Sequence, residues 1–148
     1  MNFLKYTSHL GILGCAAFGT VTFADTTEVL MACGASSGSS YFFKDPTFNP
    51  DGGKWMKDGI SNGSIMLVST GSDLDILFSD SIGGAGYKAD GAEVVLLGNN
   101  DRFFRVGAFS KYYVDIYTFD LVGKSVVWTT SKFGLTAPKV AIYEASCR

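Results

Sequence analysis

The sequence is cut at short intervals by glycine, aspartate and asparagine, and between these cuts apolar and polar residues alternate. Leu74, Ile76 and Phe78 share one face of an extended segment, and Asp73 and Asp75 fall on the opposite face. A period of two predicts β-strands that bury one side and leave the other in water. The pattern recurs along most of the chain and therefore indicates an all-β fold.

We predict a strand in each of these alternating runs, at Glu28–Cys33, Ser39–Lys44, Ser64–Thr70, Asp73–Ser79, Gly86–Ala89, Glu93–Leu97, Arg102–Phe109, Tyr112–Asp120, Ser125–Ser131 and Lys139–Cys147. One short helical turn is expected at Trp55–Asp58. The turn segments are rich in Gly, Asn and Asp, which tolerate the positive φ angles of hairpins. Such short connections favour a single antiparallel meander of about 8–10 short strands, closed as a small barrel-like sheet or as a two-layer sandwich.

Residues 1–24 have the layout of a secretory signal peptide. Lys5 supplies a positive charge, and an apolar stretch follows over Leu10–Phe23. Thr22 and Ala24 then place small residues at a signal-peptidase site. We therefore expect residues 1–24 to be removed during export.

The remainder, residues 25–148, is then a single exported β-domain in the periplasm or outside the cell. An uncleaved membrane anchor is one alternative, but it would need roughly 20 well-packed apolar residues. Lipid attachment at Cys15 is the other. No segment after residue 25 is apolar over enough length to span a bilayer, so no transmembrane segment is expected after signal cleavage.

Two cysteines, Cys33 and Cys147, remain after the leader, near the two ends of the domain. Exported chains meet oxidising conditions, so an even number of cysteines predicts a disulfide. The bridge would close a loop of about 115 residues, which stabilises the fold by roughly 4–5 kcal/mol in the chain-entropy estimate. We expect it to join the first strand to the last.

The sole histidine, His9, lies in the leader, so the mature domain would have no imidazole. That excludes catalytic triads with a histidine base and histidine-ligated metal sites. Carboxylate chemistry, Ser–Lys chemistry and hard-cation binding remain. We predict no catalytic residue and no cofactor, and we expect a protein that is not an enzyme.

The charge pattern argues against a nucleic-acid partner. With Lys5 removed, 11 of the 12 Lys and Arg residues remain against 14 acidic residues, and the basic ones are scattered. Nucleic-acid binding needs a basic run or stripe, which this sequence lacks.

Three pairs of adjacent aromatic residues, Phe42–Phe43, Phe103–Phe104 and Tyr112–Tyr113, should each place one ring on each face of a strand. The rings belong either to ordinary core and surface or to a patch that binds a protein or a small apolar ligand. The irregular stretch Asp45–Gly59 is long for a compact domain, which suggests a contact site. The candidate contact residues are Phe48, Trp55, Tyr112 and Tyr113.

The acidic residues offer weaker candidates. Asp73, Asp75 and Asp80 could supply oxygens to Ca²⁺, but their spacing matches no EF-hand loop, so we predict a solvated face and no metal site. Asp115 and Glu144 lie in apolar strands and are either buried or turned outward. Two carboxylates set about 5–10 Å apart across a cleft would allow hydrolysis.

Short segments spread over most of the domain carry a resemblance to known sequences: Ala32–Gly34, Tyr41–Phe43, Trp55, Lys57–Ser61, Asp75–Asp80, Gly83–Gly84, Tyr117–Phe119, Trp128–Thr129 and Tyr143–Cys147. In these segments the sequence resembles a group of small exported bacterial proteins with no assigned activity. It implies a signal peptide and a terminal disulfide. Periplasmic lysozyme inhibitors, which are also small disulfide-bearing β-barrels, are a more distant analogy, since no segment here matches their inhibitory motif.

Three functions are compatible with these features. The first is a non-enzymatic exported domain that binds an unknown protein or a small apolar ligand through aromatic rings and the long loop at Asp45–Gly59. The second is a periplasmic inhibitor of a muralytic enzyme, and the third is a carboxylate-based hydrolase.

Overall fold

The computed structural model describes residues 26–80, 83–134 and 137–148 of the chain. The predicted signal peptide, with its alternative lipid site at Cys15, lies outside the described residues. The prediction of an all-β fold is confirmed, since every regular element of the described residues is a strand. No helix in this part of the chain has the length and apolar character needed to cross a membrane.

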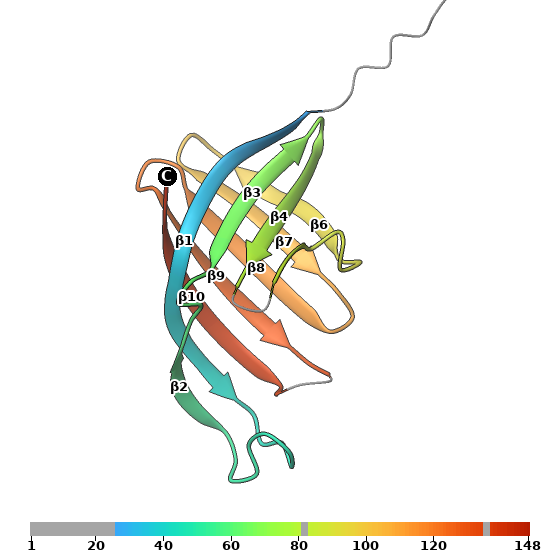
Figure 1. Ribbon diagram of the computed structural model, residues 1–148, viewed down its shortest axis with the longest axis vertical. Helices are drawn as coiled ribbons and strands as arrows, with labels where there is room; N and C mark the ends of the chain where they lie inside the picture. The colour runs from blue at the N-terminus through green and yellow to red at the C-terminus, as the bar shows by residue number, and fades with distance from the viewer. Residues whose placement is uncertain (1–25, 81–82, 135–136) are drawn as a thin grey trace, which may run out of the picture.

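The strands in chain order are β1 (Thr27–Phe42), β2 (Lys54–Asp58), β3 (Ser64–Thr70), β4 (Asp73–Ser79), β5 (Gly84–Gly86), β6 (Glu93–Asn99), β7 (Phe103–Phe109), β8 (Tyr113–Asp120), β9 (Ser125–Lys132) and β10 (Lys139–Cys147). They form one antiparallel sheet in the order β5-β4-β3-β1-β10-β9-β8-β7-β6, with β2 paired to β1 outside this path. The sheet curls into a half-barrel (Figure 1), and β4 contacts β6 across its opening. The barrel-like alternative is therefore the one that forms.

Strand β1 joins two segments that we predicted as separate strands. It pairs with β3 over Thr27–Cys33 and with β10 from Cys33 onward, while β2 pairs with its last residues. Each part of the strand therefore finds partners for its backbone N–H and C=O groups. This continuous pairing keeps the chain extended through Gly34–Gly38, where no turn is needed.

The predicted helical turn at Trp55–Asp58 is wrong, because these residues belong to strand β2. In β2, Trp55 lies opposite Tyr41 of β1, and Lys57 lies opposite Ser39. The unpaired edge of β1 supplies hydrogen-bond partners that are distant in sequence, and local periodicity does not report them.

The core lies on the concave face of the half-barrel. Ile76, Val106, Phe119 and Val126 are fully buried there. Their neighbours along each strand point to the convex face, where Val127 and Ile142 are exposed. The alternation seen in the sequence therefore marks the two faces of one curved sheet.

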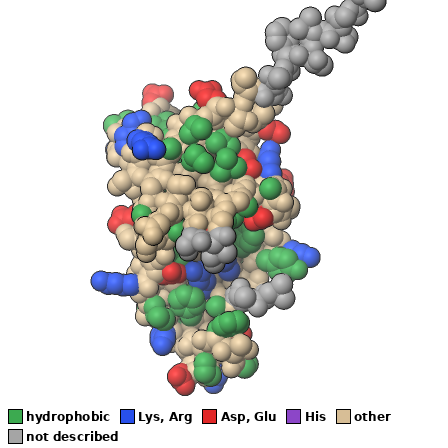
Figure 2. All heavy atoms as spheres, in the orientation of Figure 1, with side chains coloured by type: hydrophobic (Ala, Val, Ile, Leu, Met, Phe, Trp, Pro, Cys, Tyr) green, Lys and Arg blue, Asp and Glu red, His purple; other side chains and the backbone are tan. Residues whose placement is uncertain are grey.

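The predicted disulfide between Cys33 and Cys147 is present. The two cysteines lie opposite each other in the pairing of β1 with β10, so the bridge fastens the first strand to the last, as expected. On the face shown in Figure 2, basic and acidic side chains are interspersed, with no continuous basic area.

Candidate functional site

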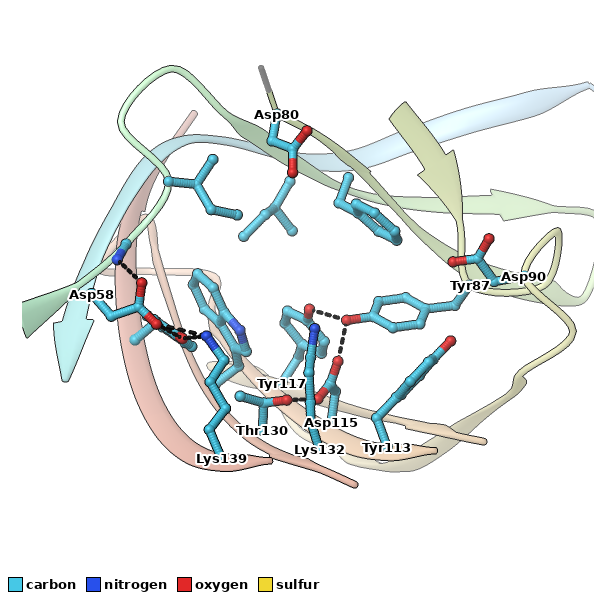
Figure 3. A pocket seen from close by; sticks show the side chains of 16 residues that line it. Asp58, Asp80, Tyr87, Asp90, Tyr113, Asp115, Tyr117, Thr130, Lys132 and Lys139 are labelled. Carbon is cyan, nitrogen blue, oxygen red and sulfur yellow. Dashed lines mark hydrogen bonds and ion pairs between the residues drawn. The ribbon is translucent and has the colours of Figure 1, made fainter. Parts of the chain in front are cut away.

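A cavity of about 220 Å³ opens on the concave face of the half-barrel. Its lining is aromatic and charged, and comes from β2, β3, β4, β8, β9, β10 and the segments that follow β2, β4 and β5: Asp58, Gly59, Ile60, Ile65, Phe78, Asp80, Tyr87, Asp90, Tyr113, Asp115, Tyr117, Trp128, Thr130, Lys132, Lys139 and Tyr143. In Figure 3, Asp58 and Lys139 lie toward one end, and Tyr87 and Asp90 toward the other.

Strand register explains why space is left here. One row across the sheet consists of Ala108, Asp115, Thr130, Ala141 and Ser40, each opposite the next on the neighbouring strand. Asp115 and Thr130 of this row line the cavity, and their side chains are shorter than the rings and lysines of the two adjacent rows. The larger side chains of the two adjacent rows stand around the resulting space.

The row on one side is aromatic. Tyr117, Trp128 and Tyr143 are neighbours in register on β8, β9 and β10. The rings of Tyr117 and Trp128 stack with their centroids 5.5 Å apart, and those of Trp128 and Tyr143 are 5.1 Å apart. This continuous array of rings forms a rigid wall of the cavity.

A second group of rings is arranged around Tyr87, from the segment after β5. Its ring is inclined by 58° to that of Phe78, by 59° to that of Tyr113 and by 69° to that of Tyr117. Because the planes are mutually inclined, these rings form a corner and not a stack. Tyr87 itself is buried, with its hydroxyl directed toward the β8 wall (Figure 3).

Asp115 is the buried polar centre of the cavity, with 2% of its surface exposed. Thr130, directly opposite on β9, donates a hydrogen bond to Oδ1, and the Tyr87 hydroxyl donates to Oδ2. The Tyr117 hydroxyl lies 2.6 Å from that of Tyr87. Since the one O–H of Tyr87 is already donated in the hydrogen bond to Asp115, Tyr117 is the donor in this second bond.

Both phenols of this network keep their protons at neutral pH. Burial, together with electrostatic interaction with the neighbouring Tyr117 and Asp115, raises the pKa of Tyr87 far above the ordinary 10.0. Burial and the charge of Asp115 also raise the pKa of Tyr117. Tyr87 and Tyr117 are therefore fixed hydrogen-bond donors at the base of the cavity.

A second network closes the opposite end. Asp58, the last residue of β2, accepts bonds on Oδ2 from Ser40, Lys139 and Tyr143, each 2.6 Å long. The Lys139 ammonium also donates to the Tyr143 hydroxyl at 2.8 Å. On Oδ1, the backbone N–H of Gly59 donates at 2.8 Å. The network joins β2 to both β1 and β10.

The charges in this network stabilise each other. Burial would raise the pKa of Asp58, but the hydrogen bonds from Lys139, Ser40 and Tyr143 outweigh it and hold the pKa well below the ordinary 3.8. Burial likewise opposes the charge of Lys139, yet bonding to Asp58 and Tyr143 raises the Lys139 pKa above 10.5. Asp58 and Lys139 are therefore a fixed ion pair, and Asp58 is a poor proton donor at neutral pH.

Three groups on the cavity have unused bonding capacity. The Tyr113 hydroxyl is buried and has no hydrogen-bond partner among the described residues. Lys132 lies over the Tyr113 ring, its ammonium 5.9 Å from the centroid, and no described carboxylate pairs with it. Asp90 likewise has no ion pair within the described segments. A ligand could therefore find both donors and acceptors here.

The structure separates the four predicted contact residues. Tyr113 lines the cavity on the concave face. Trp55 is 64% exposed on β2 and borders a shallow groove with Ile142 on the convex face. Phe48 and Tyr112 are also exposed, in the β1–β2 and β7–β8 connections respectively. These residues do not form one continuous site.

Among the acidic candidates, Asp115 and Glu144 lie on opposite faces of the sheet. Asp115 points to the concave face and is buried, whereas Glu144 is exposed on the convex face. Asp73 is exposed and pairs with Lys88 at 3.2 Å. No group of histidine, cysteine and acidic residues within 26–80, 83–134 and 137–148 is arranged to hold a metal ion.

The two hydrogen-bond networks were not predicted from the sequence. The sequence does contain a signal for part of them. Asp115 is two residues from Tyr117 and four from Phe119, and Thr130 is two residues from Trp128, so each shares a strand face with these rings. Once the aromatic rings are assigned to the core, Asp115 and Thr130 must face it too. Nothing comparable identifies Asp58, whose partners come from β1 and β10.

No family model matches the sequence, and no curated protein or solved structure is significantly similar to it.

Proposed function

We propose that this protein is a non-enzymatic, exported binding domain that takes a small, partly polar ligand into the concave cavity. The observation that carries the proposal is the cavity itself, with aromatic walls and an unpartnered buried hydroxyl on Tyr113. Binding sites for small molecules typically combine apolar walls with a few fixed polar groups. At about 220 Å³ the cavity suits a ligand smaller than a typical drug molecule.

Two features support binding over catalysis. The Asp58 carboxylate is held ionised by Lys139, so it does not supply the raised-pKa acid that paired-carboxylate hydrolysis requires. Tyr87 and Thr130 already occupy both oxygens of Asp115. These polar groups are fixed by the protein's own hydrogen bonds, which suits recognition. The disulfide between Cys33 and Cys147 is compatible with export to an oxidising compartment.

Trp128 allows a direct test. The chain has two tryptophans, so Trp55→Phe leaves Trp128, a cavity residue, as the single tryptophan, which can be excited selectively over tyrosine. We expect a saturable change in its fluorescence on titration with at least one of four probes: benzylammonium, benzyl alcohol, benzoate or glucose. NMR shift changes should map to the cavity residues.

A matched pair of variants controls for binding elsewhere. Ile60→Phe adds bulk to the cavity lining and should weaken the response, whereas Val127→Phe adds bulk to the convex face of β9 and should not. The proposal fails if none of the four probes gives a saturable response, or if the two variants respond alike.

Inhibition of a muralytic enzyme is the second candidate, favoured by the β1–β2 connection. Phe48 and Trp55 are 58% and 64% exposed there, in a hairpin that extends beyond the rest of the sheet (Figure 1). Exposed aromatic residues are common anchors of protein interfaces. Titration of lysozyme activity tests this function, and undiminished activity at micromolar protein would end it. A Phe48→Ser, Trp55→Ser variant should relieve any inhibition seen.

A further inference from the structure

We propose that the ligand of the concave cavity is a small organic cation, an amine or ammonium compound with an apolar body, whose charge lies between the buried carboxylate of Asp115 and the rings around Tyr87. This inference rests on the proposed binding function and specifies its ligand class.

The first argument is the state of Asp115. Its side chain is 2% exposed, yet the bonds it accepts come from Tyr87 and Thr130, which are neutral hydroxyls. Among the described residues no ammonium or guanidinium group pairs with Asp115. Neutral donors compensate only part of the hydration that a buried carboxylate loses, so a counter-charge beside it is favourable. The cavity beside Asp115 is where such a counter-charge can enter.

The second argument is the balance of charges that face the cavity. Four carboxylates line it, on Asp58, Asp80, Asp90 and Asp115, against the ammonium groups of Lys132 and Lys139. The lining therefore carries a net charge of −2 when all six groups are ionised. Lys139 is already neutralised by Asp58 at 2.6 Å, so the rest of the cavity has an excess of negative charge.

The third argument is the aromatic corner. The rings of Phe78, Tyr113 and Tyr117 surround Tyr87 with centroid distances of 5.4, 5.6 and 6.0 Å and inclined planes. All four residues line the cavity, so a ligand there meets several aromatic rings, and ring faces attract cations. The chain shows this attraction itself, because the Lys132 ammonium lies 5.9 Å from the Tyr113 centroid.

Lys132 gives the sharpest test, because it occupies the cavity rim as a competing cation. It lies opposite Lys139 in register, and its side chain is exposed. Removing its charge by Lys132→Gln should leave the fold intact and tighten the binding of a cation by several-fold. The same change should weaken the binding of an anion.

The probes are benzylammonium, benzyl alcohol and benzoate, which share a ring and differ in charge, together with glucose as a neutral polyol. Dissociation constants come from NMR titration or from Trp128 fluorescence of the Trp55→Phe chain. We expect benzylammonium to bind about ten-fold more tightly than benzyl alcohol, since cation–π and carboxylate contacts together supply the roughly 1.4 kcal/mol that this ratio needs. Benzoate should bind most weakly.

Two variants that each remove one carboxylate distinguish a loss of binding charge from a loss of folded protein. Asp115→Asn should abolish the preference for benzylammonium over benzyl alcohol. Because Asp115 is buried and its loss could unfold the domain, Asp90→Asn serves as the second variant. Asp90 is exposed and has no ion pair among the described residues. Its substitution should therefore weaken the binding of benzylammonium and of no other probe, while the midpoint of thermal unfolding stays constant.

Each outcome is decisive. Equal binding of the three benzyl compounds, tighter binding of benzoate, or a preference for glucose would overturn the cationic ligand and leave the binding function in place. Failure of all four probes would overturn both.

Discussion

Asp58 shows how a single residue holds separate elements together. Its Oδ2 accepts hydrogen bonds from Ser40 on β1 and from Lys139 and Tyr143 on β10, while Asp58 itself ends β2. The folded state thus binds the ionised carboxylate more strongly than the unfolded chain does. Because the pKa of Asp58 falls below 3.8 on folding, its contribution to stability is present above about pH 4 and is lost as the pH decreases further. The contribution of Lys139 depends on pH in the opposite direction. Because its pKa is raised on folding, Lys139 stabilises the fold below pH 10.5, and this stabilisation is lost at higher pH.

We therefore predict that Asp58→Asn lowers the free energy of unfolding at neutral pH and flattens its decrease between about pH 4 and pH 2. Urea unfolding across this pH range measures both effects. Asp73→Asn, which changes an exposed carboxylate, is the control and should keep the wild-type slope. Parallel curves for wild type and Asp58→Asn would contradict the role given to this carboxylate.

At the scale of elements, β1 supports one end of the cavity. Its Ser40 donates a hydrogen bond to Asp58, and its Gly38 takes the next place after Tyr143 in the row of aromatic residues. Gly38 of β1 lies opposite Tyr143 of β10. A Cβ at Gly38 would collide with the Ile142 carbonyl oxygen and come within 2.6 Å of the Tyr143 ring. The missing side chain therefore allows Tyr143 to reach Asp58.

Gly38→Ala should destabilise the domain by about 1–3 kcal/mol, the usual cost of overpacking, and displace the Tyr143 hydroxyl from Asp58. Gly34→Ala, in the same strand, meets nothing within 4 Å and should be close to neutral. Urea unfolding of the two variants gives the comparison, and equal stability would show that β10 adjusts without cost.

The sequence predicted some strands with their correct bounds and missed another. The predicted strands from Ser64 to Thr70 and from Asp73 to Ser79 match β3 and β4, because alternation and turn residues are local signals. Strand β2 was predicted as a helical turn, since its pairing with β1 is a contact between distant segments. The candidate contact residues were chosen as aromatic rings, and only Tyr113 of the four lies on the cavity.

At the scale of the whole molecule, the Cys33–Cys147 bridge secures an open structure. A half-barrel leaves β5 and β6 as unpaired edges, so the order of the sheet gives no closed ring of hydrogen bonds. The bridge lies where β1 changes partner from β3 to β10, and this position fixes both halves of the sheet.

Replacing both bridged cysteines, by Cys33→Ser and Cys147→Ser, should cost about 2–5 kcal/mol of unfolding free energy. Wild-type protein in reductant should match the double variant, which controls for the serines. Equal stability of oxidised and reduced wild-type protein would mean that the strand pairing alone holds the two halves.

The sequence by itself determined the class of fold and the disulfide, because these follow from local alternation and from a count of cysteines. The tertiary structure alone decided the curvature of the sheet and the partners of Asp58 and Asp115. It also decided where the large side chains leave a space. These properties depend on the register between strands distant in sequence: Ser40, Asp58 and Tyr143 meet at one end of the cavity because β1 pairs with both β2 and β10.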